Sequence, residues 1–166
     1  MNRRILLLGA AALMASGACT AAGDEPASDA NEARFADSSW RRLSDAQWRA
    51  RLSPAAYQVL RHEGTERPGS SRLLNEHRAG VFVCAGCALP LFRSAWKYES
   101  GTGWPSFFRI IAENHATKTD HVIGYPRTEY HCARCLGHQG HVFNDGPAPT
   151  GLRYCNNGVA LRFVPA

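Results

Sequence analysis

The sequence predicts a mainly β protein, in which antiparallel strands joined by tight turns follow two short N-terminal helices. Three observations lead to this prediction. From Gly64 onward, short apolar or alternating runs lie between Gly, Pro, Asn and Asp, the residues that favour turns. Before Gly64, serines stand at two positions typical of helix N-caps. Two C-x-x-C pairs far apart in the chain indicate a metal site that joins distant turns of one fold.

Residues 1–22 are predicted to be a signal peptide. A basic start with Arg3 and Arg4 precedes an apolar run over 5–15, which is too short for a permanent membrane span, and small residues follow. A buried N-terminal helix fits this three-part pattern less well. Two forms of the signal stay open, because Arg3 and Arg4 resemble a twin-arginine signal and Cys19 follows small residues as in a lipoprotein. We expect export, either periplasmic or membrane-anchored facing the periplasm.

Residues 23–39 are expected to form a disordered tether. This stretch is small, polar and acidic, and it has no apolar period with which to pack. A folded domain is then expected over residues 40–166, a length that allows one domain with a buried core.

Two short helices are predicted where this domain begins. Ser44 is placed to cap the first, which runs through Arg51. Ser53 and Pro54 open the second, because the N–H that proline lacks has no partner in a first turn. Gly64 is expected to end it. The apolar contacts of the two helices are expected from Leu43, Trp48, Tyr57, Val59 and Leu60.

The remainder of the chain is predicted to form an antiparallel, turn-rich sheet system. Each predicted strand is an apolar or alternating run bounded by turn-forming residues. The predicted strands span residues 81–84, 121–125, 129–132, 141–143, 152–155 and 159–164.

The pairs Cys84/Cys87 and Cys132/Cys135 predict one structural zinc ion. Cysteines separated by two residues on a tight turn are able to bind one ion tetrahedrally through their thiolates. Disulfides are the alternative in an exported protein. A C-x-x-C pair is strained as a disulfide, however, and the spacing fits thiolate ligands better. Four protein ligands leave no open coordination position, so the ion is expected to be structural.

Cys155 stands alone in RYCNN and is expected to be a nucleophile. The alternative for a lone cysteine is packing in the core, which these polar flanks do not favour. Arg153, two residues earlier on the same strand face, is placed to favour the thiolate, as are His138 and His141. The histidines are alternative metal ligands, but four thiolates already fill a shell. Acid/base chemistry is therefore their expected role.

Trp104 lies between glycine and proline in SGTGWPSF. A turn of this kind exposes an aromatic face at the rim of a pocket. Such a face holds an apolar or sulfur-bearing group with about 0.3–1.5 kcal/mol. A core tryptophan is the alternative, and periodicity alone favours it.

The composition argues against nucleic acid as a partner. The formal net charge is +5, which includes Arg3 and Arg4 of the leader, and 20% of residues are charged. The remaining charges are scattered, and no basic run marks a nucleic-acid surface.

Taken together, these segments resemble the methionine-R-sulfoxide reductase B family. Two C-x-x-C pairs, GWPSF, GHVF with Asp-Gly after it, and RYC-x-N occur in this order, and the likeness runs from about residue 43 to 164. The resemblance implies two antiparallel β-sheets with short N-terminal helices. It also implies reduction of methionine-R-sulfoxide, free or in proteins, by a cysteine that passes through a sulfenic acid.

The resemblance divides the site residues into two groups. The catalytic group, with Cys155 as nucleophile and the others around the sulfoxide oxygen, comprises Cys155, His141, His138 and Asn157. The substrate-binding group, with Trp104 as the wall for the methyl group, comprises Trp104, Phe143, Arg153 and Asp145. We expect His141 to protonate the departing oxygen.

One position departs from the family pattern. Many members carry a second, resolving cysteine in the segment that here reads SGTGW, and this chain has Thr102 there. With the metal cysteines assigned, the domain offers no free thiol besides Cys155. A thioredoxin-like or other external thiol donor is therefore expected to regenerate Cys155.

The rival hypothesis is a non-catalytic zinc-ribbon binding module, in which Cys155 is a packing residue. The expected partners of the enzyme are oxidised protein or peptide methionine and the thiol reductant. We expect a monomer that contacts a membrane only through a lipid anchor at Cys19.

Overall fold

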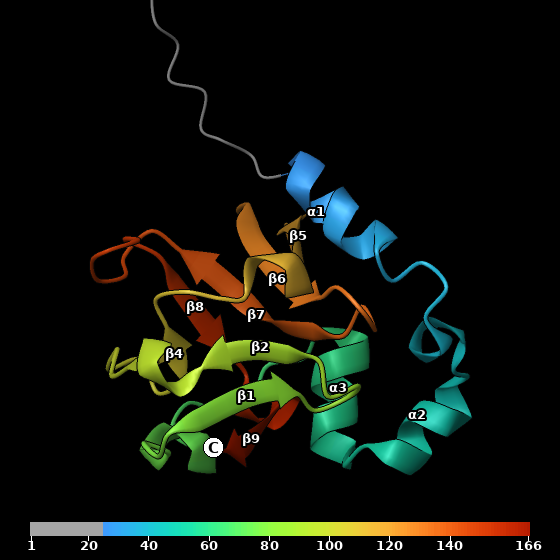
Figure 1. Cartoon of the computed structure of the whole chain (residues 1–166), viewed down its shortest axis with the longest axis horizontal. Helices are drawn as coiled ribbons and strands as arrows, with labels where there is room; N and C mark the ends of the chain where they lie inside the picture. Colours follow the sequence, from blue (N-terminus) through green and yellow to red (C-terminus); the bar gives the residue numbers. More distant parts are fainter. Residues whose placement is uncertain (1–24) are drawn as a thin grey trace, which may run out of the picture.

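The computed structural model describes residues 25–166, with side chains from residue 28 (Figure 1). The predicted signal peptide, including Cys19, lies outside the described residues. Among the helices of the described chain, none combines the length and the apolar character that a membrane span needs.

The strands form two antiparallel sheets, and the predicted mainly β class is confirmed. The smaller sheet has the order β2-β1-β9 and comprises β1 (Gly80–Cys84), β2 (Pro90–Arg93) and β9 (Leu161–Pro165). The larger has the order β3-β4-β8-β7-β6-β5. Its strands are β3 (Lys97–Tyr98), β4 (Ser106–Phe107), β5 (His115–Asp120), β6 (Arg127–Cys132), β7 (His138–Phe143) and β8 (Arg153–Asn156). Figure 1 shows the two sheets stacked, with α3 beside them.

The predicted strands overlap observed ones except over residues 121–125, and the first two residues of the 159–164 run form a 3-10 turn before β9. The prediction over residues 121–125 was wrong, because these apolar residues form the exposed turn between β5 and β6. Gly124 adopts φ 85°, in the left-handed region, and its N–H donates to the carbonyl oxygen of His121. The apolar run therefore turns the chain around instead of pairing.

Both predicted helices are present with the predicted caps. α2 (Asp45–Arg51) follows Ser44, whose hydroxyl and backbone N–H exchange hydrogen bonds with the glutamine three residues on. α3 (Pro54–His62) follows Ser53, whose hydroxyl accepts from a first-turn N–H. The left-handed residue that ends α3 is Glu63, with φ 55°, one residue before the predicted glycine. Short 3-10 helices are η1 (Ser39–Arg42), η2 (Arg72–Asn75), η3 (Ser94–Trp96), η4 (Ala112–Asn114) and η5 (Gly158–Ala160).

The expectation of a disordered tether over residues 23–39 is corrected from residue 25 onward, where the described chain begins. A helix, α1 (Glu25–Ala33), lies against β5, the edge strand of the larger sheet (Figure 1). The hydroxyl of Ser28 donates to the Thr117 carbonyl at 3.0 Å and accepts from the Thr117 N–H at 2.8 Å. Asn31 donates to two further backbone carbonyls nearby. The helix thus satisfies backbone groups that an edge strand leaves open, using polar side chains instead of an apolar face.

The core between the two sheets is rich in aromatic side chains. Phe92 of β2 stacks on Phe107 of β4, with ring centroids 4.0 Å apart and planes at 12°. Phe92 also meets Tyr130 of β6 and Tyr154 of β8 edge-on. Such aromatic pairs contribute about 0.5–1.5 kcal/mol each beyond the area they bury. Because Tyr154 directly precedes Cys155, this packing fixes β8 where it carries the candidate nucleophile.

Candidate active site and metal centre

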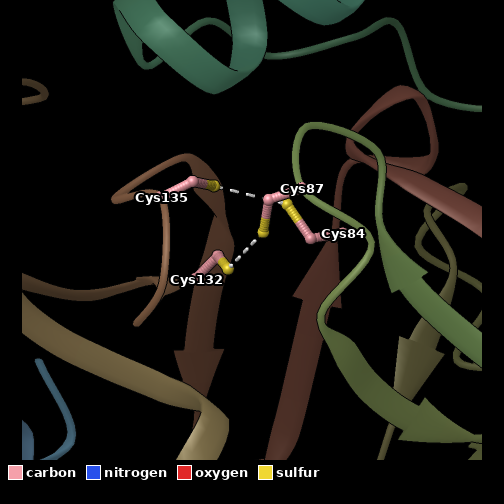
Figure 2. A group of neighbouring side chains, drawn as sticks. All are labelled: Cys84, Cys87, Cys132 and Cys135. Atoms are coloured by element: carbon pink, nitrogen blue, oxygen red, sulfur yellow. Dashed lines mark hydrogen bonds between the residues drawn. The ribbon is translucent and has the colours of Figure 1, made fainter. Parts of the chain in front are cut away.

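The two C-x-x-C pairs lie on turns that end one strand of each sheet. Cys84 closes β1 of the smaller sheet, and Cys132 closes β6 of the larger one. Figure 2 shows the two turns facing each other, with the four sulfur atoms directed toward a common centre. A metal ion held there would join the two sheets at one end.

The four thiols have the arrangement that a tetrahedral metal site requires. Their sulfur atoms all lie within 4.8 Å of one another, and all four residues are buried. Cys84 Sγ lies 3.6 Å from Cys135 Sγ, and Cys87 Sγ lies 3.5 Å from Cys132 Sγ (Figure 2). Metal–sulfur bonds of about 2.3 Å in a tetrahedron place the sulfurs about 3.8 Å apart. These separations fit shared ligation and are far beyond the about 2.05 Å of a disulfide.

Gln139 provides a second sign of a metal centre. Its side-chain amide is fully buried on β7 and donates to Cys84 Sγ at 3.4 Å. Hydrogen bonds of this kind orient ligands and stabilise their charged forms. The residues present therefore fit a structural metal ion, with Cys84, Cys87, Cys132 and Cys135 as its ligands.

Cys155 lies inside the larger sheet, on β8 between β4 and β7. Its direct cross-strand partners are Ser106 and His141. Residues directly opposite in antiparallel strands point to the same face, with Cβ atoms about 4.5–5.5 Å apart. A Cβ built on Gly140 would lie 1.9 Å from the Cys155 carbonyl oxygen, so the close approach of β7 to β8 requires glycine there. The Cys155 thiol and the His141 imidazole consequently share one face.

A cavity of about 130 Å³ opens at this face. The sequence-predicted residues that line it are Cys155, Trp104, His141, Phe143 and Asn157. The walls of this small cavity therefore include an imidazole, a thiol and two aromatic rings.

Asp120, at the end of β5, orients His141. One carboxylate oxygen of Asp120 lies 2.7 Å from His141 Nε2 and also accepts from the Arg127 guanidinium. The Val122 N–H donates to the other oxygen at 2.7 Å. The Val122 N–H, with His141 and Arg127, holds the pKa of the Asp120 carboxyl well below its usual range despite desolvation. Because this carboxylate is ionised and accepts only, Nε2 of His141 carries the proton of the neutral ring.

Burial sets the protonation of His141 itself. Burial lowers the pKa of the imidazole, and the Asp120 carboxylate offsets this only in part. The ring is therefore neutral at pH 7, with Nδ1 as its acceptor nitrogen.

His138 lies on β7 with His141 but is not among the residues that line the cavity. Its Nδ1 is 2.9 Å from a Glu129 carboxylate oxygen, and both side chains are buried. The His138 ring meets the His141 ring edge-on, with centroids 5.5 Å apart. His138 thus supports the imidazole that faces the cavity.

Arg153 and Asp145 form a pair next to the cavity wall. The guanidinium donates twice to the Asp145 carboxylate, each time at 2.8 Å. The same guanidinium lies 4.4 Å from the ring centroid of Phe143, its cross-strand partner. This arrangement holds the Phe143 ring where it lines the cavity.

Glu66 holds two site residues in place through its backbone. Trp104 Nε1–H donates to the Glu66 carbonyl at 3.1 Å, and the Glu66 N–H donates to Asn157 Oδ1 at 3.0 Å. The Glu66 carboxylate in turn accepts from the N–H groups of Gly158 and Val159. The indole is therefore tied by its edge, which leaves its face as a wall of the cavity.

Thr102 lies beside Cys155. A hydrogen bond from its side chain lowers the pKa of the Cys155 thiol. Thr102 Oγ1 is 2.8 Å from Ser100 Oγ, which is 2.7 Å from Ser106 Oγ. A chain of hydroxyls thus occupies the position next to the thiol.

The structure differs from the sequence-based expectation of a thiolate at Cys155. Burial raises the pKa of the Cys155 thiol above its ordinary value. Arg153 and Thr102 act in the opposite direction, but burial outweighs them. Cys155 is consequently a thiol at neutral pH in the free protein.

Comparison with known proteins identifies the family. The model of the SelR domain matches residues 52–165. The chain belongs to the SelR-domain family.

Relatives of this SelR-domain protein carry the name peptide methionine sulfoxide reductase MsrB, and the resemblance stated from the motifs is confirmed. One from Bradyrhizobium diazoefficiens is 54% identical over 118 residues, which are 70% of this chain and 85% of the relative. One from Caulobacter vibrioides is 53% identical over 118 residues, 70% of this chain and 74% of the relative. One from Methanosarcina barkeri is 51% identical over 113 residues, 68% of this chain and 80% of the relative.

Sequence reasoning missed three residues of the cavity wall in this SelR domain, and also Asp120. Thr65, Arg127 and Gly140 line the cavity, and Asp120 contacts His141. Gly140 lies in the GHQGHVF segment and directly precedes His141. This position next to a predicted site residue was the signal that could have found it. No local pattern marks the others, because the β5–β6 register and the Glu66 contacts bring them to the site.

Proposed function

We propose that this protein reduces methionine-R-sulfoxide to methionine, with Cys155 as the nucleophile. The observation that carries the proposal is a single thiol, Cys155, opposite the His141 imidazole in a small cavity with aromatic walls. Membership of the SelR-domain family supports the same activity. Relatives that are 51–54% identical carry the name peptide methionine sulfoxide reductase MsrB.

The cavity suits the end of one oxidised methionine side chain. A cavity of about 150 Å³ holds a benzene molecule, and the volume at Cys155 is about 130 Å³. The faces of Trp104 and Phe143 suit a methyl group bonded to sulfur. The polar side, with His141 and Asn157, suits the sulfoxide oxygen. This opposition of apolar and polar walls supports selection of one sulfoxide stereoisomer.

The chemical step transfers one oxygen atom. The Cys155 sulfur attacks the sulfoxide sulfur and forms a sulfur–sulfur bond, while neutral His141 takes the thiol proton and delivers it to the sulfoxide oxygen. The sulfur–oxygen bond then breaks, and the hydroxide that is released adds to the Cys155 sulfur and breaks the sulfur–sulfur bond. The oxygen ends on Cys155 as a sulfenic acid, and methionine leaves. Thiol plus sulfoxide thus give sulfenic acid plus thioether. The raised pKa of Cys155 keeps the thiol proton in place until substrate binds, and the lowered pKa of His141 makes its protonated ring a stronger acid toward the sulfoxide oxygen.

An external thiol donor regenerates Cys155. The first donor thiol condenses with the sulfenic acid to a mixed disulfide and water, and a second releases the donor disulfide and the Cys155 thiol. Thr102 beside the thiol supports this route, since a hydroxyl forms no disulfide. The donor is of the thioredoxin type or another dithiol.

Zinc is the metal that best fits the four-cysteine site. A buried, closed shell of four thiolates is typical of structural zinc. When bound, the ion supplies folding free energy and a fixed connection between the sheets, and it supplies no open coordination position. The catalytic step is left to Cys155 and its neighbours.

The rival hypothesis, a non-catalytic zinc module, leaves the cavity unexplained. A packing cysteine needs neither a cavity nor an oriented histidine, and Cys155 has both. Trapping separates the two hypotheses. One equivalent of methionine-R-sulfoxide without reductant is expected to leave a dimedone-reactive sulfenic acid at Cys155. The absence of modification, with substrate unconsumed, would contradict the proposed function.

We also propose that the chain is exported by the signal over residues 1–22 and acts as a monomer in the periplasm. The basic, apolar and small-residue segments of the leader support export. Mass analysis of the mature protein from fractionated cells tests this, and lipid at Cys19 would add an anchor. A full-length cytoplasmic chain would contradict it. Light scattering tests the monomer.

A further inference from the structure

Exposed large apolar side chains concentrate in one loop of the described chain. In the turn between β5 and β6, Val122 is 81% exposed, Ile123 50% and Tyr125 58%. The other exposed large apolar residues of the described chain, Leu136 at 39% and Val164 at 47%, lie in separate places. Single exposed apolar residues are ordinary, whereas a cluster indicates a contact surface.

This β5–β6 loop, residues 121–126, rises from the wall of the cavity. Its base is the pair Asp120 and Arg127, the last register pair of β5 and β6. Arg127 lines the cavity, and Asp120 contacts His141. The Val122 N–H donates to Asp120, which fixes the first residues of the loop to the site. The base of the loop therefore adjoins the cavity wall.

The cavity leaves most of a polypeptide substrate outside. Its volume of about 130 Å³ holds the end of one side chain. Neighbouring residues of an extended peptide follow at about 3.3 Å each, so the first few on either side lie over the rim. Methionine is itself apolar and is generally surrounded by apolar residues in protein cores. When such a segment unfolds and is oxidised, its flanking residues present apolar surface.

We propose that the β5–β6 loop is a docking surface for the apolar residues that flank methionine sulfoxide in an unfolded polypeptide. This inference rests on the proposed function and adds a preference for apolar, unfolded segments. Val122, Ile123 and Tyr125 bury apolar area against the flanking residues, while the sulfoxide occupies the cavity. The loop thus contributes to binding and leaves the chemistry to the cavity.

A lipid surface fits this loop less well. Residues 121–126 contain no Lys, Arg, Asp or Glu. Loops that bind anionic membranes use basic residues for headgroups. A membrane on the loop would also cover the cavity mouth at Arg127, where a side chain has to enter. A peptide occupies loop and cavity together without this conflict.

The test compares two substrates in the full zinc-loaded protein. The variant Ile123→Ser, Tyr125→Ser, which leaves the Val122 contact to Asp120 unaltered, is measured with N-acetylmethionine-R-sulfoxide and with a short unfolded peptide that places leucines beside the sulfoxide. We expect kcat/KM for the peptide to fall about tenfold, the effect of losing burial of one or two apolar side chains. The value for the small substrate is expected to stay unchanged. Leu136→Ser, Val164→Ser is the matched control, and both values are expected to stay unchanged there.

Two results would overturn the docking surface. These are an unchanged peptide-to-small-substrate ratio in the loop variant and an equal loss with a peptide flanked by serines. If the unchanged ratio came together with lost binding to anionic phospholipid vesicles, the loop would be assigned to a membrane surface instead. Tyr125→Ser alone, at a position that is 58% exposed, repeats the test if the double variant melts early. A wild-type protein inactive on both substrates would instead refute the proposed function, so the two failures are distinguishable.

Discussion

Nε2 of His141 lies 2.7 Å from the Asp120 carboxylate, and His141 is the direct cross-strand partner of Cys155. The pair places an oriented imidazole opposite the thiol. Because Asp120 engages Nε2, Nδ1 is the ring nitrogen left to exchange a proton with the thiol and the sulfoxide oxygen. The order Asp120–His141–Cys155 runs across the larger sheet from β5 to β8.

The first prediction concerns pH. The proton transfer needs neutral His141 and protonated Cys155, or the equivalent ion pair with the same total charge. Because burial lowers the pKa of His141, kcat/KM is expected to fall only as pH drops below the ordinary histidine value of about 6.5. Because burial raises the pKa of Cys155, the alkaline fall is expected above the ordinary value of about 8.5. A pH profile of single-turnover reduction checks both limbs.

Variants of His141 and Asp120 separate the acid/base chemistry of the imidazole from its positioning. His141→Ala is expected to lower kcat by about 10²–10⁴-fold, the usual contribution of acid/base catalysis. Asp120→Asn is expected to lower kcat less and to move the acid limb to lower pH, because Asp120 raises the His141 pKa. Wild-type turnover in His141→Ala, or an unmoved acid limb in Asp120→Asn, would assign the proton transfer elsewhere, with His138 the next candidate.

Trp104 is expected to act on recognition. Its indole is tied by Nε1 to Glu66, so the ring face lines the cavity. Trp104→Ala is expected to raise KM more than it lowers kcat and to weaken the preference for the R stereoisomer. Steady-state rates with the separated R and S sulfoxides measure this. Trp96→Ala, at a tryptophan that does not line the cavity, is the control. An unchanged R-to-S ratio in Trp104→Ala would remove the indole from substrate selection.

Because Thr102 stands where many family members carry a resolving cysteine, one turnover is expected to consume one thiol. Zinc-loaded protein treated with one equivalent of substrate, without reductant, is expected to lose a single thiol. Because the Thr102 side chain reaches the Cys155 thiol, Thr102→Cys is expected to lose two thiols and to form a 102–155 disulfide. Thiol titration and peptide mapping measure both outcomes. A Cys19–Cys155 disulfide in the unmodified protein would contradict the single-thiol prediction.

The four-cysteine site is expected to determine stability more than chemistry. Structural zinc supplies on the order of 10 kcal/mol of folding free energy in small zinc peptides. Cys84→Ser removes one ligand and the acceptor of the Gln139 amide, so zinc content and melting temperature are both expected to fall. Cys155→Ser, which leaves the metal shell intact, is expected to retain about one zinc per chain. A fully folded, metal-free Cys84→Ser protein would exclude structural zinc.

Features specified by nearby residues were predictable from the sequence. Ser44 and Ser53 cap α2 and α3 through contacts within one turn, and each C-x-x-C pair carries its own geometry. Features that depend on distant contacts were not. Helix α1 is held against an edge strand by the hydrogen bonds between Ser28 and Thr117. Because these contacts are polar, the sequence of α1 has no apolar periodicity from which a packed helix could be predicted.

The active site shows the same division. Cys155, His141 and Trp104 lie in recognisable segments, and the structure brings them to one cavity. Asp120 joins them only through the pairing of β5 with β6 and β6 with β7. The protonation state of Cys155 was not predictable from the sequence. The sequence shows Arg153, which lowers the pKa of the thiol, but it does not show the burial of Cys155, which raises that pKa by more.

The most direct test of the central claim is stereo-resolved turnover of methionine sulfoxide with dithiothreitol as the thiol donor. We predict that the zinc-loaded wild-type protein consumes the R sulfoxide and leaves the S sulfoxide. Cys155→Ser, with unchanged zinc content and folding, is predicted to consume neither. Undiminished turnover in Cys155→Ser, or none in the wild type, would contradict the assignment of Cys155 as the nucleophile of a methionine-R-sulfoxide reductase.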